Sequence, residues 1–217
     1  MRAPVELEVF ADILCPFTHV GLRRLVEERT RRGAEGPALW VRAWPLELVN
    51  GAPMQPLAVA EKVAALRRDV APDLFEGFDP QRFPATSLPA LRLAAAAYRI
   101  GLATGEVVSL ALRSAVFESG LDIADPQVLA DLSEAYGIGP VTSADAASVD
   151  DDWAEGSIRG VVGSPHFFLD HRDWFCPTLA ITRDDGALQI TRDEEAFQAF
   201  TREAFGDPDP VRVGDPA

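Results

Sequence analysis

One cysteine of this chain stands where its sulfur could be reactive. Cys15 lies in the segment FADILCPFT, residues 10–18, in which an apolar strand passes directly into a helix. The free N–H groups and the dipole of a helix N-terminus favour an anion, and the thiolate is the reactive form of cysteine. The sequence therefore predicts thiol chemistry at Cys15.

The residue three positions after Cys15 limits what that chemistry can be. A two-cysteine redox motif would have its second cysteine there, and this chain has Thr18. Thr18 cannot resolve a mixed disulfide, but its hydroxyl could donate a hydrogen bond to the Cys15 sulfur. We interpret Cys15 and Thr18 as candidate catalytic residues of a single-cysteine site. The alternatives are a cysteine that packs as a small apolar residue and an ordinary first-turn threonine.

A second short motif begins at Gly163 and continues through Ser164 and Pro165 into the apolar stretch Phe167–Leu169. Proline cannot donate to a strand ladder, so it belongs at the first residue of a strand. If its peptide bond is cis, the preceding backbone turns sharply toward a neighbouring element. We expect that element to be the start of the helix that carries Cys15.

Other polar residues near these motifs are possible auxiliaries. Asp12 is either a buried acid beside the thiol or a turn-forming residue, His19 faces the site or solvent, and His166 approaches the site or packs in a strand. Cys176 could pair with Cys15 if its loop reaches that far. The cysteines and histidines lack the spacing of metal ligands, so we expect no metal site.

Composition excludes several classes of protein. A chain of 217 residues that is 47% hydrophobic can bury one substantial core or two smaller ones. A net charge of −14 argues against nucleic acid as a partner. No apolar run approaches the roughly 18 residues of a membrane span, no signal region is visible, and only two cysteines are present. We expect a cytoplasmic protein without a membrane partner, from a bacterium whose coding bias leaves Lys62 as the only lysine.

The elements that must position these residues follow from periodicity and from turn residues. The first 50 residues predict a strand from Val5 to Ala11, a helix from Pro16 to Arg32 and a strand that leaves at Leu48. Such a β-α-β unit implies parallel strands joined by a crossover helix.

The next hundred residues have the pattern of helices. Candidate N-caps are Ser87, Thr104, Asp125 and Thr142 or Ser143, and the acidic run 150–152 indicates a solvated face. After Gly163 we expect the strand Phe167–Leu169, a further extended stretch, and a hairpin between residues 179–182 and 188–191. A capping box of Thr191 and Glu194 then opens a last helix.

The predicted fold class is therefore α/β, a mixed sheet with a large helical insertion. Residues 1–50 and 161–206 form the discontinuous sheet domain, residues 51–160 the insertion, and residues 207–217 a flexible tail.

The two motifs, together with this order of elements, resemble the DsbA-like branch of the thioredoxin superfamily. That branch includes 2-hydroxychromene-2-carboxylate isomerases, kappa-class glutathione transferases and cytosolic DsbA-like oxidoreductases. The resemblance covers roughly residues 5–205 and rests on three segments, VFAD…CPF from Val9, the helical insert around Ser87–Gly101, and GSPHFFL from Gly163. It implies a thioredoxin-like sheet.

The resemblance also implies roles for individual residues. Cys15 is the expected nucleophile, Pro165 the cis-proline opposite it, and the Ser164 backbone the contact for a peptide or a thiol cofactor. Pro16 and Phe17 would complete the substrate-binding surface.

On this reading the chain is a DsbA-like thiol–disulfide oxidoreductase with one active-site cysteine. A glutathione- or mycothiol-dependent transferase or isomerase, and a thioredoxin-fold protein that only binds a partner, stay open as alternatives. We expect no tightly bound cofactor, a small thiol or disulfide as substrate, glutathione or mycothiol as co-substrate, and possible assembly as a homodimer.

Overall fold

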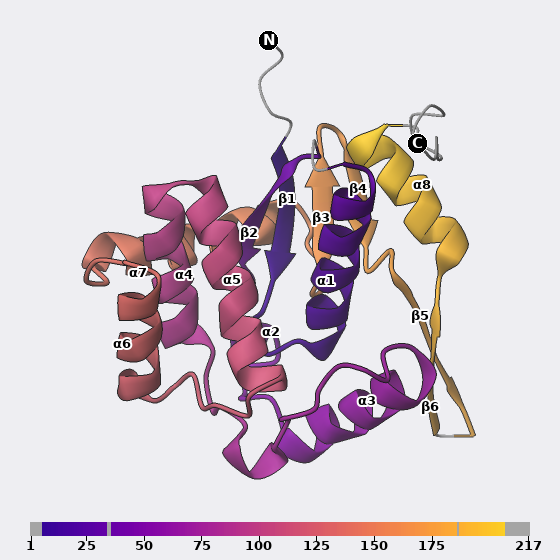
Figure 1. The fold of residues 1–217 in the computed structure, drawn as a ribbon, viewed down its shortest axis with the longest axis horizontal. Coiled ribbons are helices and arrows are strands. Elements are labelled where there is room, and N and C mark those ends of the chain that lie inside the picture. The colour runs from indigo at the N-terminus through magenta and orange to yellow at the C-terminus, as the bar shows by residue number, and fades with distance from the viewer. Residues whose placement is uncertain (1–5, 34–35, 186, 207–217) are drawn as a thin grey trace, which may run out of the picture.

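The fold is built on one mixed sheet of four strands in the order β2-β1-β3-β4 (Figure 1). The computed structural model describes residues 6–33, 36–185 and 187–206. Strand β1 (Glu6–Ala11) runs parallel to β2 (Ala38–Ala43) and antiparallel to β3 (His166–Leu169), which in turn pairs with β4 (Arg172–Phe175). The predicted thioredoxin-like α/β class is confirmed.

Helices α1 (Pro16–Arg31) and α8 (Glu194–Phe205) lie over one face of this sheet (Figure 1). Their apolar side chains meet those of β1, β2 and β3 in one buried cluster, which includes Leu7, Val9, Leu22, Leu25, Phe167, Phe197 and Phe200. Alternate residues of β1 enter this cluster because successive side chains of a strand point to opposite faces. The packing of β1 therefore fixes the position at which the chain enters α1.

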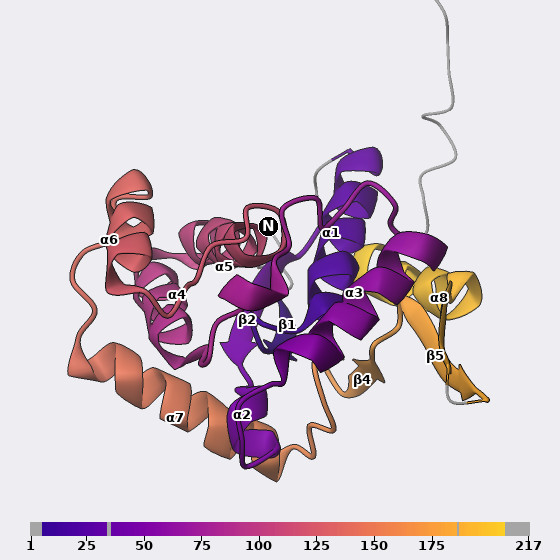
Figure 2. The same ribbon diagram turned by 90° about the horizontal axis from the view of Figure 1, so that it is seen from below.

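The opposite face of the sheet carries α7 (Ser143–Ile158) (Figure 2). Phe10 packs there on Trp44, and Trp44 packs on Trp153 of α7, with 4.5 Å between the two indole centroids. Asp152 accepts hydrogen bonds from Arg42 Nε at 2.7 Å and Ala43 N at 2.8 Å. The interpretation of residues 150–152 as a solvated face is therefore wrong for Asp152. Its carboxylate accepts hydrogen bonds from β2, the strand at the edge of the sheet.

The segment between β2 and α7 is helical, as predicted. It contains α2 (Leu46–Val49), α3 (Pro56–Asp69), a 3-10 turn (Pro80–Arg82), α4 (Leu88–Ile100), α5 (Leu102–Phe117) and α6 (Pro126–Ala135). Capping confirms two of the predicted starts: the Asp125 side chain accepts from Gln127 N, and Thr142 forms a capping box with Asp145. The helices surround a second, larger apolar core.

The predicted hairpin is confirmed: β5 (Leu179–Asp184) pairs antiparallel with β6 (Ala187–Arg192). It forms a sheet of its own, and Leu188 and Ile190 pack into the core cluster that contains residues of α3. Two predicted helix starts are wrong. Thr104 lies inside α5, whose N-cap is Gly101. The N-cap of α8 is Asp193, whose side chain accepts from Ala196 N, while Thr191 lies inside β6. Ser87 stands at the N-cap of α4 without a side-chain capping bond.

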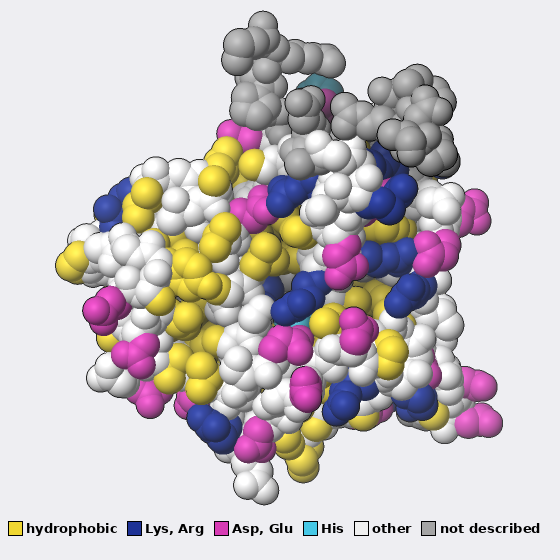
Figure 3. Space-filling model, viewed as in Figure 1, with side chains coloured by type: hydrophobic (Ala, Val, Ile, Leu, Met, Phe, Trp, Pro, Cys, Tyr) yellow, Lys and Arg dark blue, Asp and Glu magenta, His cyan; other side chains and the backbone are white. Residues whose placement is uncertain are grey.

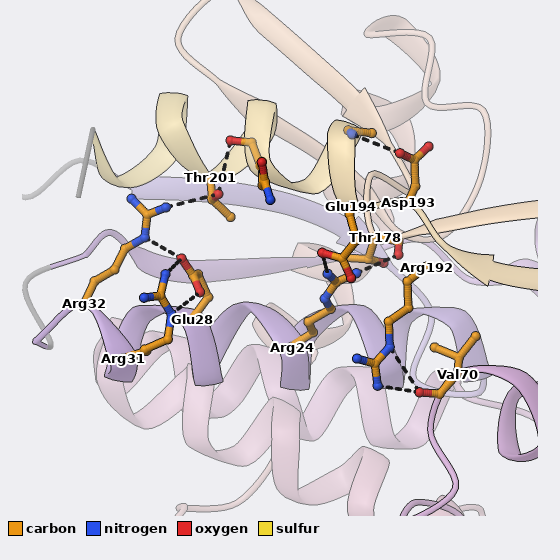
Figure 4. A network of polar contacts seen from close by, with 12 residues as sticks. Arg24, Glu28, Arg31, Arg32, Val70, Thr178, Arg192, Asp193, Glu194 and Thr201 are labelled. Atoms are coloured by element: carbon orange, nitrogen blue, oxygen red, sulfur yellow. Dashed lines mark hydrogen bonds and ion pairs between the residues drawn. The ribbon is translucent and has the colours of Figure 1, made fainter.

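Helix α8 is tied to α1 by a network of polar contacts (Figure 4). Arg24 donates to Glu194 Oε2 at 2.5 Å and to the Thr178 carbonyl at 3.1 Å. Arg32 donates to Glu28 Oε1 at 2.6 Å and to Thr201 Oγ1 at 3.3 Å. This network holds the C-terminal part of the chain against the helix that begins at Cys15.

Charged side chains of both signs are mixed over the α1 and α8 side of the surface, whereas hydrophobic side chains gather over the helical segment (Figure 3). No helix within the described residues is long and apolar enough to cross a membrane. The predicted flexible tail, 207–217, lies outside the described residues.

Candidate active site

Cys15 stands at the junction of β1 and α1, where the sequence placed it. It is the N-cap of α1, with Pro16 as the first helical residue, and its side chain caps no backbone N–H. The residue is only 3% exposed. Its Sγ donates to the Ser164 carbonyl oxygen at 3.1 Å, so the thiol faces the entry of β3.

The Ser164–Pro165 peptide bond is cis and directly precedes β3. The Pro165 ring lies against the first turns of α1: a Cβ added to Gly21 would lie 3.8 Å from Pro165 Cγ. The proline ring and the helix are therefore in van der Waals range at Gly21. The two motifs recognised in the sequence, near residues 15 and 165, meet in space.

Thr18 is fully buried, and its partner differs from the one expected. Its Oγ1 lies 2.7 Å from Ser164 Oγ, which also accepts from Asp12 N at 2.9 Å. Within the described part of the chain, the Thr18 hydroxyl thus bonds the serine side chain instead of the Cys15 sulfur. Its role is to join α1 to the proline loop, and it positions the acceptor that Cys15 uses.

Asp12 is a buried clamp at the end of β1. Its carboxylate accepts from Leu14 N at 2.8 Å, Leu46 N at 2.6 Å and Ser87 Oγ at 3.2 Å. Burial raises the pKa of this carboxyl, and the hydrogen bonds oppose the rise. Asp12 therefore fixes the turn before Cys15 to the first residue of α2 and to the N-cap of α4, which also explains why Ser87 does not cap its helix.

His19 and His166 are both committed to partners away from the sulfur. His19 is buried between the rings of Phe75 and Phe117, and its Nε2 lies 2.5 Å from Glu118 Oε1. Burial lowers the pKa of His19, with Glu118 opposing the shift, so its ring is neutral at pH 7 and donates from Nε2. The alternative that His19 faces solvent is wrong.

His166 packs in its strand. Val162 N donates to its Nδ1 at 3.3 Å, and its Nε2 lies 2.9 Å from Asp173 Oδ2. Because Nδ1 accepts, Nε2 carries the hydrogen. Both ring nitrogens are occupied, so His166 has no nitrogen left for Cys15.

Pro16 and Phe17 form the rim of the junction. Pro16 is buried, whereas Phe17 is half-buried and packs on the core that contains α3. Lys62 Nζ lies 5.7 Å from the centre of the Phe17 ring, a distance at which a cation is attracted by the ring face. Phe17 is thus the half-exposed residue of the segment CPFT.

A family model described as a DSBA-like thioredoxin domain matches residues 6–180. The chain belongs to this family. The match begins with β1, includes Cys15, and ends within β5, just after Cys176.

Solved structures share the fold of this DSBA-like chain at low identity. A 2-hydroxychromene-2-carboxylate isomerase is 17% identical, with a TM-score of 0.59 over 91% of this chain and 93% of the isomerase. The cytosolic disulfide reductase DsbM from Pseudomonas aeruginosa, in its structure with GSH, is 16% identical, with a TM-score of 0.62 over 92% of this chain and 98% of DsbM. A search of curated proteins gave no match.

One residue of this DSBA-like site was missed from the sequence. Arg113 of α5 is fully buried beneath the turn before Cys15; it donates to Ser109 O at 2.8 Å, to Ser109 Oγ at 2.6 Å and to Asp12 O at 3.4 Å. Burial lowers its pKa to about 10, opposed by Tyr98, Asp12 and Cys15. The sequence did hold a signal for this residue: Arg113 lies on the same face of the predicted helix as the apolar residues Leu112 and Val116.

Cys176 is the second thiol beside the proline loop. It is 6% exposed, its backbone has φ = 46°, and its N–H donates to the Pro165 carbonyl at 3.0 Å. Burial raises the pKa of its thiol to about 12, and the neighbouring Cys15 adds to the rise. Both cysteines are free. Within the described residues, no group of three His, Cys, Asp or Glu side chains could hold a metal.

Proposed function

We propose that this DSBA-like protein is a thiol–disulfide oxidoreductase whose nucleophile is Cys15. The observation that carries the proposal is the contact of its Sγ with the Ser164 carbonyl, at 3.1 Å. This contact puts the sulfur at the N-terminus of α1 beside the backbone that enters β3. A disulfide that docks along that segment would present a sulfur to Cys15.

The exchange begins when the Cys15 thiolate attacks one sulfur of a disulfide, forms a mixed disulfide and releases the other half as a thiolate. The Cys15 sulfur then carries no hydrogen and no longer donates to Ser164. The freed carbonyl can accept an N–H from the attached molecule, as the next strand of a sheet would. Thr18 holds this loop in place through Ser164 Oγ, 2.7 Å away.

The burial of the site favours small substrates. At 3% exposure, Cys15 offers little surface to a folded protein. We therefore propose as substrate a small disulfide in which glutathione or mycothiol is bonded to a different small thiol, with glutathione or mycothiol as reductant in a reducing cytoplasm. The net reaction then releases the other thiol and forms the disulfide of the reductant. The DsbM structure of similar fold, which was solved with GSH, supports this class of ligand.

The second candidate is a thiol-dependent transferase or isomerase. It is favoured by Thr18, which leaves the motif with one cysteine, and by the fold similarity to the isomerase. In that case a cofactor thiol would bind beside Cys15 and Ser164 without forming a lasting covalent bond to the protein.

The experiment is to mix the reduced protein with glutathione disulfide and to follow released glutathione and the mass of the intact protein. We expect Cys15 to be consumed, either as a glutathione adduct or as a protein disulfide, and Cys15→Ser to release no glutathione above background. Cys176→Ser should still react. If Cys15 of the folded protein does not react while a small alkylating reagent modifies it, the oxidoreductase proposal fails and the transferase remains.

A further inference from the structure

We propose that Cys176 is the resolving cysteine of this site, and that Cys15 and Cys176 close a reversible disulfide during turnover. This inference rests on the proposed function, since it needs a mixed disulfide at Cys15. It assigns to a residue 161 positions away the task that Thr18 cannot perform.

The two cysteines bond the carbonyl groups of adjacent residues in the proline loop, Cys15 through its thiol and Cys176 through its backbone N–H. Cys15 Sγ bonds the Ser164 carbonyl at 3.1 Å, and Cys176 N bonds the Pro165 carbonyl at 3.0 Å. The second bond continues the β3–β4 ladder by one step beyond the pair His166↔Phe175. Cys176 therefore stands beside Pro165 as a neighbouring strand residue does, about 5 Å away between Cα atoms in such a ladder.

The segment that carries Cys176 is anchored to α1 on its other side. The Thr178 carbonyl accepts from Arg24 at 3.1 Å and from Asp193 N at 3.2 Å (Figure 4). A Cβ added to Gly21 would lie 3.2 Å from Thr178 Oγ1. The helix that begins with Cys15 thus contacts both Pro165 and the turn after Cys176.

A buried hydroxyl beside Cys176 lacks a partner in the resting protein. Thr178 is fully buried, and its Oγ1 has no hydrogen-bond acceptor or donor among the described residues. An unpaired buried hydroxyl is unfavourable, and a thiolate on Cys176 would give it an acceptor. A hydrogen bond from Thr178 to the ionised thiol would lower the pKa of Cys176, against the rise caused first by burial and then by Cys15.

The charge on Cys15 determines the order in which the two cysteines react. The neighbouring Cys15 contributes to the raised pKa of Cys176, about 12, after the larger contribution of burial. A mixed disulfide at Cys15 is neutral and removes this repulsion. Cys176 is therefore easier to ionise after the first exchange than before it, which suits a residue that acts second.

The complete reaction balances. The Cys15 thiolate attacks a disulfide RSSR, forming Cys15–S–S–R and releasing RS⁻. Cys176 gives its proton to solvent, and its thiolate attacks Cys15 Sγ; the bond from Cys15 to R breaks, and the second RS⁻ leaves. The substrate disulfide gains two electrons, and the two protein thiols lose them. A low-molecular-weight thiol then reduces the protein disulfide and is itself oxidised to its disulfide.

The test is a rapid-quench titration of the reduced wild-type protein with glutathione disulfide, read by intact mass and by peptide mapping. We expect a transient glutathione adduct on Cys15, followed by a species that has lost two hydrogens and contains a Cys15–Cys176 crosslink. The wild-type measurement needs no substitution, so misfolding of a variant cannot imitate the result. A wild-type adduct that persists without a crosslink would overturn the inference.

Two variants separate the steps. Cys176→Ser should accumulate the Cys15 adduct at the wild-type rate. Cys176→Ala should behave in the same way, which shows that a buried serine hydroxyl does not disturb the fold. Thr178→Val keeps the side-chain shape and removes the unpartnered hydroxyl; we expect normal adduct formation but closure of the crosslink slowed about tenfold, which equals 1.4 kcal/mol in the barrier. Equal closure rates in Thr178→Val and wild type would contradict the role of Thr178.

The outcomes also distinguish the two proposals. If the proposed function fails, no adduct forms on Cys15 in either the wild type or Cys176→Ser. If only the present inference fails, both proteins form the same stable adduct. If both hold, the wild type alone proceeds to the crosslink.

Discussion

The Cys15 sulfur and the Ser164 carbonyl oxygen lie 3.1 Å apart although 149 positions separate them in the chain. The contact is supported from both sides, because Ser164 Oγ is bonded to Thr18 Oγ1 and to Asp12 N. The position of the nucleophile against the strand segment is thus set by side chains of α1 and by the end of β1. Substitutions of Thr18 and Ser164 should therefore change the free energy of unfolding in a coupled way.

Thr18→Val should destabilise the protein by about 1–2 kcal/mol, because it leaves Ser164 Oγ without one of its partners. Ser164→Ala should cost more, about 1–3 kcal/mol, since Asp12 N then loses its acceptor inside the protein. The double variant should lose less than the sum of the two, by about 1 kcal/mol. Urea unfolding of the four proteins measures this coupling.

A threonine on the surface of the same helix provides the control. Thr30 is exposed and its Oγ1 bonds the Val26 carbonyl within α1. Thr30→Val should change the stability by less than about 0.5 kcal/mol and should not couple to Ser164→Ala. Strict additivity of Thr18→Val and Ser164→Ala would refute the bond between them.

Arg24 should matter more to stability than another arginine of α1. Arg24→Met removes bonds to the Thr178 carbonyl and to Glu194, so the turn after Cys176 and the start of α8 lose their tie to α1. We expect a loss of about 1.5–3 kcal/mol, as for hydrogen bonds to charged groups. Thermal unfolding measures the loss.

The matched variant is Arg31→Met. Arg31 also pairs with a glutamate, Glu28, but within one helix and at an exposed position. Such exposed pairs contribute about 0.2–1 kcal/mol. A larger effect of Arg31→Met than of Arg24→Met would mean that the network between α1 and α8 does not hold the two elements together.

Much of the fold could be predicted because local patterns and tertiary structure agree. The strand of residues 6–11 alternates, α1 begins with proline after its N-cap, and α6 has an aspartate cap followed by proline. The meeting of Cys15 with Pro165 was also predictable, since a β-α-β unit followed by a strand leaves few places for the proline loop.

The missed features depend on partners that are distant in sequence. Ser87 has the residue type of an N-cap but donates to Asp12, and Asp152 lies in an acidic run but bonds to the edge of β2. Thr18 and Arg113 likewise satisfy groups on other elements. A sequence pattern states what a side chain can bond, whereas packing decides which partner it meets.

His19 should make the protein less stable as the solution becomes acidic. Its folded pKa is lowered by burial, so the unfolded chain binds the proton first as the pH falls through about 6.5. Stability then rises with pH up to that value and is flat above it, as far as this group is concerned. His19→Phe should flatten the stability profile between pH 5 and pH 7 relative to wild type.

His171 is the control for this measurement because it is exposed in the turn between β3 and β4. His171→Gln should keep the wild-type dependence of melting temperature on pH. If His19→Phe and wild type lose stability in parallel on acidification, the burial of a neutral His19 is not the cause.

Arg113→Met should destabilise the protein by an amount that grows as the pH rises above the ordinary carboxyl pKa of about 4. The substitution removes three hydrogen bonds and the positive charge that favours ionisation of the Asp12 carboxyl. Without that charge the pKa of buried Asp12 rises further. The folded state then holds a proton that the unfolded chain has released above its ordinary pKa near 3.9, so stability falls as the pH rises through this window.

A second substitution isolates the charge from the packing. In Arg113→Met combined with Asp12→Asn, no carboxyl titrates at the turn, so the added pH dependence should vanish while a constant destabilisation remains. Urea unfolding at pH 5, 6 and 7 gives both slopes. A destabilisation by Arg113→Met that is the same at all three values would show that Arg113 acts through packing and hydrogen bonds alone, and that its charge does not reach the turn that presents Cys15.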